Sequence, residues 1–176
     1  MLFRSNTEDN ISVLSLATSY TDTAGNAGPD NTTANYVVDT LAPSVDNFTL
    51  SDTALKIGDT ATVTLVFSEA VASFSSAADI TADNGTLATM TSADNITWTG
   101  TFTPTANTED ASNTLTLATS YTDTAGNAGP AATTANYAVE TLAPSVNSVA
   151  ISSASGVQNS LDRKSTRLNS SHTSIS

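Results

Sequence analysis

The chain has 176 residues and a formal net charge of −12, from 17 acidic and five basic residues. It contains no cysteine, and its one histidine, His172, lies near the C-terminus. These counts exclude disulfides and thiol chemistry, and they argue against Ser-His-Asp or Cys-His catalysis, structural zinc and a basic nucleic-acid surface. No apolar run reaches the ~18 residues of a membrane-spanning helix, and the first nine residues lack the apolar core of a signal peptide. We therefore expect no enzyme, no nucleic-acid partner and no membrane insertion.

An internal repeat organises the chain. Residues 6–45 match residues 107–146 at an offset of 101, and 31 of these 40 positions are identical. The shared text includes LATSYTDTAGNAGP, TTANY and TLAPSV. An offset near 100 is too long for solenoid repeats and has the size of a whole domain. The chain therefore reads as part of a tandem array of domains.

The repeat sets the expected domain boundaries. We expect residues 1–40 to be the C-terminal part of a truncated repeat, 41–141 a complete repeat, and 142–161 the start of the next one. Met1 then falls inside a repeat rather than at a biological start. Only residues 41–141 can close a core, so both flanks are expected to pack poorly, or to dock onto the central domain in ways that the full protein would not use.

The last fifteen residues differ from the rest of the chain. After Asp162 no acidic residue follows and basic residues appear, and the strand alternation stops. The run DRKSTRLNSSH, Asp162–His172, resembles one translated frame of the DNA adapter used in short-read library preparation. We expect residues 162–176 to be a non-native tail and leave them out of functional reasoning; the alternative is a flexible polar C-terminus.

Within the complete repeat, apolar residues alternate with threonine. Val63, Leu65 and Phe67 share one side of a strand while the threonines between them share the other, and Trp98 and Phe102 continue this inward pattern. Asn84-Gly85 is a hairpin signal. Trp98 is the expected core anchor. We predict seven strands from the following segments: 45–51, 60–67, 71–75 with 79–83, 86–90, 95–103, 113–121 and 132–139.

Seven short strands in about 100 residues predict an all-β fold, an Ig-like antiparallel β-sandwich repeated every 101 residues. In antibody domains the conserved tryptophan lies on the third strand beside a disulfide. Trp98 lies on the fifth predicted strand and cysteine is absent, so the domain is not of the antibody type.

The segments DTLAPSV, VTLVFSEAV, ITADNGTLATM and WTGTFTPTANTEDASNTLTLATSYTDTAGNAG occur in this order. Together they resemble the bacterial immunoglobulin-like repeats of very large surface and secreted adhesins. The resemblance implies an extracellular sandwich in tandem copies, often with calcium at the domain junctions.

Calcium prefers six to eight oxygen ligands, and this chain is rich in carboxylates. In a sandwich of this order, the second-to-third and sixth-to-seventh strand loops lie at the end where the chain enters. We call this the proximal end and the opposite one the distal end. The first junction would then gather Asp39, Glu69, Asp123 and Asn127 with Glu8 and Asp9 of the preceding repeat, and the next would use Glu109, Asp110 and Glu140. The alternative is that these residues are ordinary turn formers and solvated carboxylates.

The resulting expectation is a non-catalytic structural stalk or spacer of a large bacterial adhesin, stiffened by calcium at its junctions. It would lie outside the cell or on the bacterial surface. Its partners would be neighbouring repeats, with host or surface glycans or proteins bound through other parts of the parent. Two alternatives remain: a module that itself binds glycan or protein, and a spacer in a secreted multidomain hydrolase.

Overall fold

The computed structural model describes residues 7–150 and divides the chain into two units, residues 1–143 and 144–176. The second unit is described only over residues 144–150, which form no strand or helix and are exposed. A strand was expected to begin the next repeat there. It does not appear in the described part of 142–161, because a strand needs a partner for its backbone N–H and C=O groups. The remainder of that segment and the tail at 162–176 lie outside the described residues.

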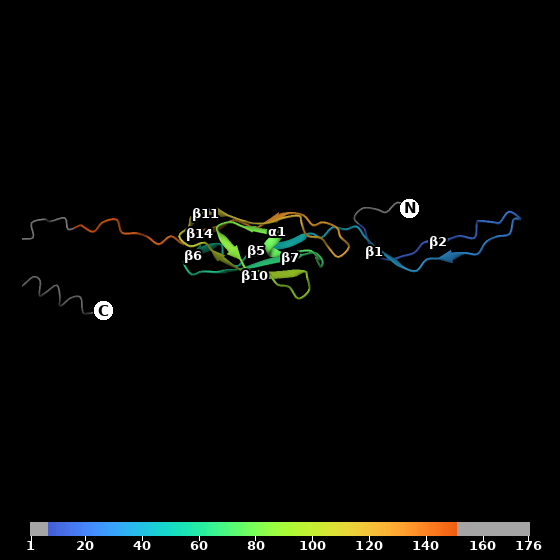
Figure 1. Ribbon diagram of the computed structural model, residues 1–176, viewed down its shortest axis with the longest axis horizontal. Coiled ribbons are helices and arrows are strands. Elements are labelled where there is room, and N and C mark those ends of the chain that lie inside the picture. Colours follow the sequence, from blue (N-terminus) through green and yellow to red (C-terminus); the bar gives the residue numbers. More distant parts are fainter. Residues whose placement is uncertain (1–6, 151–176) are drawn as a thin grey trace, which may run out of the picture. The chain divides into compact units, whose positions relative to one another are not determined.

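Residues 45–140 form two β-layers (Figure 1). The first is an antiparallel sheet in the order β5, β7, β10, β9. These strands are β5 Val45–Leu50, β7 Ala61–Phe67, β10 Thr97–Pro104 and β9 Gly85–Leu87. Buried and more accessible residues alternate along β7, as the threonine alternation predicted.

The second layer consists of two short sheets. β11 of one sheet is followed in sequence by β12 of the other, and β13 by β14. One has the order β11 (Glu109–Asn113), β14 (Tyr137–Glu140), β6 (Ala54–Lys56). The other has the order β13 (Ala132–Thr133), β12 (Leu115–Leu117), β8 (Ile80–Ala82). A register shift in the pairing of β11 with β14 lies between Asp110 and Asn113. β11 ends at Asn113 and β12 begins at Leu115, so the predicted sixth strand, 113–121, is a strand only at Asn113 and over 115–117. The layer pairing is that of an Ig-like sandwich, and the predicted fold class is confirmed.

Aromatic rings fill the space between the layers. Phe67 lies against Tyr121 at 4.9 Å between ring centroids, and Phe102 against Tyr137 at 5.2 Å. The apolar core comprises these four together with Phe48, Leu55, Ala61, Val63, Leu65, Val71, Phe74, Met90, Leu115, Leu117 and Val139.

Three sequence-based details were wrong. Trp98 is only half-buried, packed edge-on to Phe74 at one side of the core, and its indole nitrogen has no hydrogen-bond partner among the described residues. Residues 71–75 form no strand: only Val71 makes a single bridge, to Asp123, and the chain then enters the short helix α1, Ser76–Asp79. The third correction concerns the Asn84-Gly85 hairpin.

Asn84 adopts positive φ as its sequence predicts, but β8 and β9 do not pair with each other. β8 pairs with β12 and β9 pairs with β10, so the turn carries the chain from one layer to the other. Gly85 is required by packing rather than by its φ, since a Cβ there would overlap the Phe102 ring. The local turn signal was right, and the core placed the two strands on opposite sides.

The structure also adds β6, which sequence alternation did not reveal. β6 pairs in parallel with β14, from Ala138 opposite Ala54 to Glu140 opposite Lys56. A turn follows it directly: Asp59 accepts hydrogen bonds from the Lys56 ammonium at 2.8 and 2.9 Å and from its backbone N–H at 3.1 Å. Three residues are too few to show a period of two.

Residues 7–40 fold as a long hairpin with short strands. These are β1 Glu8–Ser12, β2 Ser15–Leu16, β3 Asn31–Thr32 and β4 Tyr36–Asp39, with β1 paired to β4 and β2 to β3. They correspond to β11, β12, β13 and β14 of the complete repeat, and the residues paired between strands are the same in both copies after a shift of 101. The hairpin therefore reproduces the last four strands of the sandwich.

Candidate metal centre

The turn between β12 and β13 is organised by one carboxylate. Oδ1 of Asp123 accepts backbone N–H bonds from Ala125 at 2.8 Å, Gly126 at 2.7 Å and Asn127 at 2.8 Å. Oδ2 accepts a bond of 2.8 Å from the Asn127 side-chain amide. Gly126 has a φ of +96°, a conformation that glycine adopts without steric cost. Asp123 is buried, so this turn is a fixed part of the domain.

The same turn forms in the first copy without a surrounding core. Oδ1 of Asp22 accepts N–H bonds of 2.9 Å from Ala24 and Asn26, and Oδ2 accepts the Asn26 amide at 2.8 Å. Gly25 there also has positive φ. Because Asp22 is exposed while Asp123 is buried, the turn is encoded locally and only its burial depends on the sandwich.

The linker between the hairpin and the sandwich is held against the proximal end. Ser44 donates its N–H to Ser68 Oγ at 2.9 Å, and Ser68 returns its N–H to the Ser44 carbonyl at 3.0 Å. The Asn127 amide lies 3.3 Å from the Asp39 carbonyl and 3.4 Å from that of Leu41. Sequence reasoning missed Ser44 and Ser68, because serine in a loop carries no distinctive signal; the position of Ser68 beside Glu69 was the only hint.

Three carboxylates converge at this end. Asp39 closes β4, Glu69 follows β7, and Asp123 lies in the turn after β12, and their carboxylate oxygens lie within 4.8 Å of one another. Asp123 is buried and the other two are half-buried. Segments far apart in the sequence thus bring three of the predicted site residues together.

The electrostatics of the three carboxylates are unfavourable without a cation. Burial raises the pKa of Glu69, and the charges of Asp123, Asp39 and Glu8 raise it further. Burial acts in the same direction on Asp123, but the Asn127 side chain and three backbone N–H groups outweigh it and lower its pKa. Among the described residues the only basic side chain is Lys56, which is engaged with Asp59. No protein cation therefore offsets the cluster within the described part.

The donor set fits a calcium ion. Every candidate ligand is a carboxylate oxygen, the type that calcium prefers. Glu69 accepts no hydrogen bond from any described residue, and Asp39 uses one oxygen for the Leu41 N–H at 3.1 Å. Oδ1 of Asp123 is filled by its three N–H bonds, so only Oδ2 has a lone pair for an ion. Asn127 is turned with its amide nitrogen toward Asp123, and its role as an oxygen ligand stays a prediction.

The remaining predicted ligands fall into two kinds of position. Glu8 lies opposite Asp39 in the β1–β4 pair, as Glu109 lies opposite Glu140 in the β11–β14 pair. The two aspartates beside them serve turns instead. Asp9 accepts bonds from the Ile11 N–H at 2.9 Å and the Ser12 hydroxyl at 3.0 Å.

Asp110 accepts the Asn84 amide at 2.8 Å and the Ser112 N–H at 2.9 Å. It therefore faces the turn between β8 and β9. Successive residues of a strand point to opposite sides. Glu8 and Asp9 therefore cannot both reach the same junction, and the same holds for Glu109 and Asp110. In the described residues, Glu109, Asp110 and Glu140 do not form a cluster like that at the proximal end.

The raised pKa of Glu69 predicts an unusual pH response of the metal-free protein. The folded state holds the Glu69 proton more tightly than the unfolded chain, whose value is near 4.5, so stability falls as pH rises above that value. The lowered pKa of Asp123 acts in the opposite sense, but only below its ordinary 3.8. In chelator, we expect the melting temperature to rise by a few degrees when the pH is lowered from neutral to about 5.

Glu69→Gln should remove most of this rise, because the neutral amide does not titrate. Glu109→Gln, which removes one acidic charge at the distal end, should leave it in place. Thermal melts of the three proteins at the two pH values measure the effect. A melting temperature that falls on acidification in all three would contradict the assigned repulsion.

Comparison with known proteins gives one match. The pattern that defines the family described as "Bacterial Ig-like domain" matches residues 39–139, more than half of the chain. The same comparison finds no curated protein and no solved structure that matches this chain. Domains of this family are generally non-catalytic and commonly extracellular or surface-associated. Among the described residues, no helix has the length and apolar character to cross a membrane. From its two-layered fold and the match over residues 39–139, the chain belongs to the bacterial Ig-like domain family.

Proposed function

We propose that this chain is a structural spacer in the stalk of a large bacterial surface or secreted adhesin, and that calcium stiffens the junction between successive repeats. The observation that carries the proposal is the cluster of three carboxylates at the proximal end. There the last strand of one repeat, the linker and two loops of the next repeat bring Asp39, Glu69 and Asp123 together. A cation held by residues from both sides of a junction would restrict the angle between them.

The linker supports the same reading. Pro43 fixes its own backbone φ and restricts Ala42 before it, so residues 40–44 have little freedom to bend. The paired bonds between Ser44 and Ser68 attach this segment to the following domain. When bound, calcium would neutralise the repulsion among the three carboxylates. With calcium removed, repulsion at Glu69 would favour an open junction.

The aromatic side chains support a spacer over a glycan-binding module. Sugar-binding surfaces commonly expose aromatic rings, which offer apolar area with a polar edge. Trp98 instead packs against buried Phe74, with 4.9 Å between ring centroids. A spacer inside a secreted hydrolase would use the same module in the same way, so that alternative differs only in what the spacer connects.

Junction stiffening can be tested on the full chain with paired spin labels. The sequence has no cysteine, so Thr23→Cys and Thr101→Cys place one label on the hairpin tip and one on the exposed face of β10. Calcium should narrow the distribution of distances between the labels and raise the melting temperature. At a free calcium concentration 100 times the dissociation constant, binding adds about 2.7 kcal/mol to the stability.

Glu69→Gln is the decisive variant, because Glu69 holds no turn and its replacement removes only one carboxylate ligand and its charge. It should abolish both calcium responses. Glu109→Gln, with the same change of charge at the distal end, should keep them. If the wild-type chain responds to calcium in neither measurement, the three carboxylates are a solvated cluster and the junction is an ordinary flexible linker.

A further inference from the structure

Asn84-Gly85 is the one Asn-Gly pair in the sequence, and such a pair can react with itself. The Gly85 nitrogen attacks the side-chain carbonyl carbon of Asn84 and forms a C–N bond, while the amide nitrogen takes up the displaced proton and leaves as ammonia. Water then opens the cyclic imide. The products are aspartate and its isomer, in which the main chain runs through the side-chain carbon. Glycine favours the attack because it has no side chain beside the nitrogen.

The folded domain holds the Asn84 side chain through its amide nitrogen. This nitrogen donates to Asp110 Oδ2 at 2.8 Å and to Asn113 Oδ1 at 2.7 Å. The partners fix this orientation. A carboxylate can only accept, and the Asn113 nitrogen already donates to the carbonyls of Asp110 at 2.9 Å and Tyr137 at 3.1 Å. The Asn84 nitrogen can therefore leave as ammonia only after both of its bonds break.

The backbone around the pair is held as well. The Asn84 carbonyl accepts the Thr105 N–H at 2.8 Å, and the preceding Asp83 carbonyl accepts the Tyr137 hydroxyl. Asn113 is 1 % exposed, so the network reaches the edge of the core. β8 before the turn and β9 after it belong to different layers. Release of Asn84 thus requires that the turn between β8 and β9 separates from β11.

The products of the reaction do not fit this site. Aspartate at position 84 would place a carboxylate oxygen where the amide nitrogen now lies, against the Asp110 carboxylate and the Asn113 side-chain oxygen. None of these oxygens carries a hydrogen to donate, and two negative charges so close together repel. The isomer would add a carbon to the main chain before Gly85, where even an added Cβ would overlap the Phe102 ring.

We propose that Asn84 is a modification site that becomes reactive only when the domain opens. The folded network protects its amide from cyclisation, and a chain that has reacted while open cannot rebuild the network. The substrate is the chain itself, and water is the only co-reactant. The modification would make a prolonged opening permanent, because its products favour the open state. This proposal depends neither on calcium nor on the stalk role.

Mass spectrometry of the full chain tests the protection against an internal comparison. Asn147, followed by Ser148, is exposed and lies outside any strand. In urea at mildly alkaline pH, Asn84 should deamidate before Asn147, because glycine hinders the attack less than serine does. In the folded chain the order should reverse, with Asn84 reacting at least ~100-fold more slowly than in urea. Equal rates at Asn84 in the folded and unfolded chain would overturn the proposal.

A matched pair of variants tests whether the network provides this protection. Asp110→Ala removes one of the two acceptors and should speed the reaction of Asn84 in the folded chain about 10-fold. Asp9→Ala is the equivalent change in the hairpin, where Asp9 holds only its own turn, and should leave the rate at Asn84 unchanged. If Asp110→Ala reacts no faster than the wild type, the network does not hold the amide and the proposal fails.

Asn84→Asp produces the aspartate product directly. It should lower the ratio of folded to unfolded chain about 100-fold, measured by urea unfolding with Trp98 fluorescence. Adding Asp110→Asn exchanges donor and acceptor across the 2.8 Å pair and should recover at least ~10-fold. A loss of stability unrelated to this contact would not be relieved by the second change. The proposal is overturned if Asn84→Asp is as stable as the wild type, or if the exchange recovers nothing.

Discussion

Replacing Asp123 by alanine is expected to destabilise the sandwich by about 3 kcal/mol in the absence of divalent ions. The substitution removes a buried carboxylate that accepts hydrogen bonds from three backbone N–H groups and from the Asn127 amide. Hydrogen bonds to an ionised carboxylate are stronger than bonds between neutral groups, so the loss of four of them is costly. Trp98 is the only tryptophan and lies on β10, so its fluorescence during urea unfolding reports the loss directly.

The chain contains its own control for this experiment. Asp22→Ala breaks the same turn in the exposed hairpin and should leave the Trp98 transition unchanged. Asp123→Asn keeps an oxygen acceptor without the charge and should cost about half as much. Equal losses for Asp22→Ala and Asp123→Ala would mean that the hairpin and the sandwich unfold as one unit. Chelator in every sample separates this turn role from any part that Asp123 has in holding a cation.

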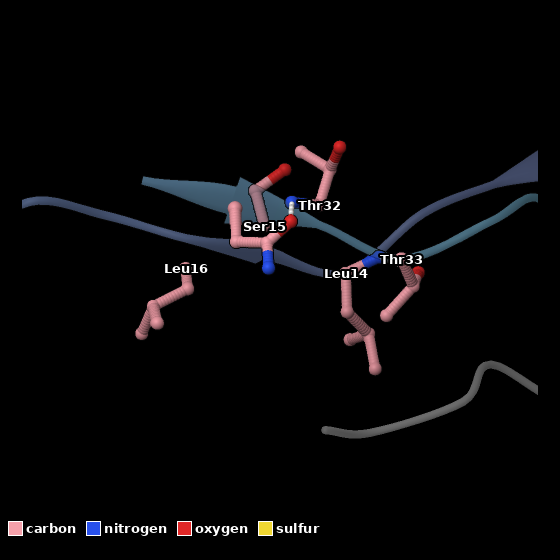
Figure 2. A pocket seen from close by; sticks show the side chains of 6 residues that line it. Leu14, Ser15, Leu16, Thr32 and Thr33 are labelled. Carbon is pink, nitrogen blue, oxygen red and sulfur yellow. Dashed lines mark hydrogen bonds between the residues drawn. The ribbon is translucent and has the colours of Figure 1, made fainter. Parts of the chain in front are cut away.

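Leu117→Ala should also cost about 3 kcal/mol, because Leu117 is fully buried and truncation of a core leucine leaves a cavity. Its first-copy equivalent, Leu16, lies within the same local sequence but is 53 % exposed on the hairpin at residues 7–40 (Figure 2). Leu16→Ala should therefore lower the stability reported by the Trp98 transition by less than about 0.5 kcal/mol.

The comparison of these two leucines isolates burial from sequence context. Each leucine begins the same run, LATSYTDTAGNAGP, so the residues that follow it are identical in the two copies. The copies differ in whether other strands bury the leucine. If Leu16→Ala cost as much as Leu117→Ala, residues 7–40 would have to share the core of the sandwich, and Leu16 would have to be buried in solution. Guanidinium and urea unfolding should agree on this result.

Much of the sandwich could be predicted because its signals are local. The alternation in 61–67 depends only on which residues face the core, and the Asp-Thr-Ala-Gly-Asn turn forms in both copies whether or not a core surrounds it. Positive φ at Asn84 was likewise predictable from residue type. What could not be predicted was the partner of each strand. The segments before and after Asn84 pair in different layers, and that choice is made by Phe102 and the rest of the core.

The candidate site divides in the same way. The strand order of an Ig-like sandwich was enough to place Asp39, Glu69 and Asp123 at one end. It could not show that Asp9 and Asp110 turn toward local backbone and side-chain donors, because that depends on the register of each short strand. Nor could it show that most of the Asp123 carboxylate is already occupied by its own turn.

The parallel pairing of β6 with β14 has a mechanical consequence for a chain pulled from both ends. Tension enters through β5 and leaves through β14, and β6 continues the path of β5. The three pairs from Ala138–Ala54 to Glu140–Lys56 then lie side by side along the direction of pull. Such a patch is loaded in shear, so its bonds must break together rather than unzip one after another. A short strand that the sequence pattern did not reveal would thus set the force at which the domain gives way.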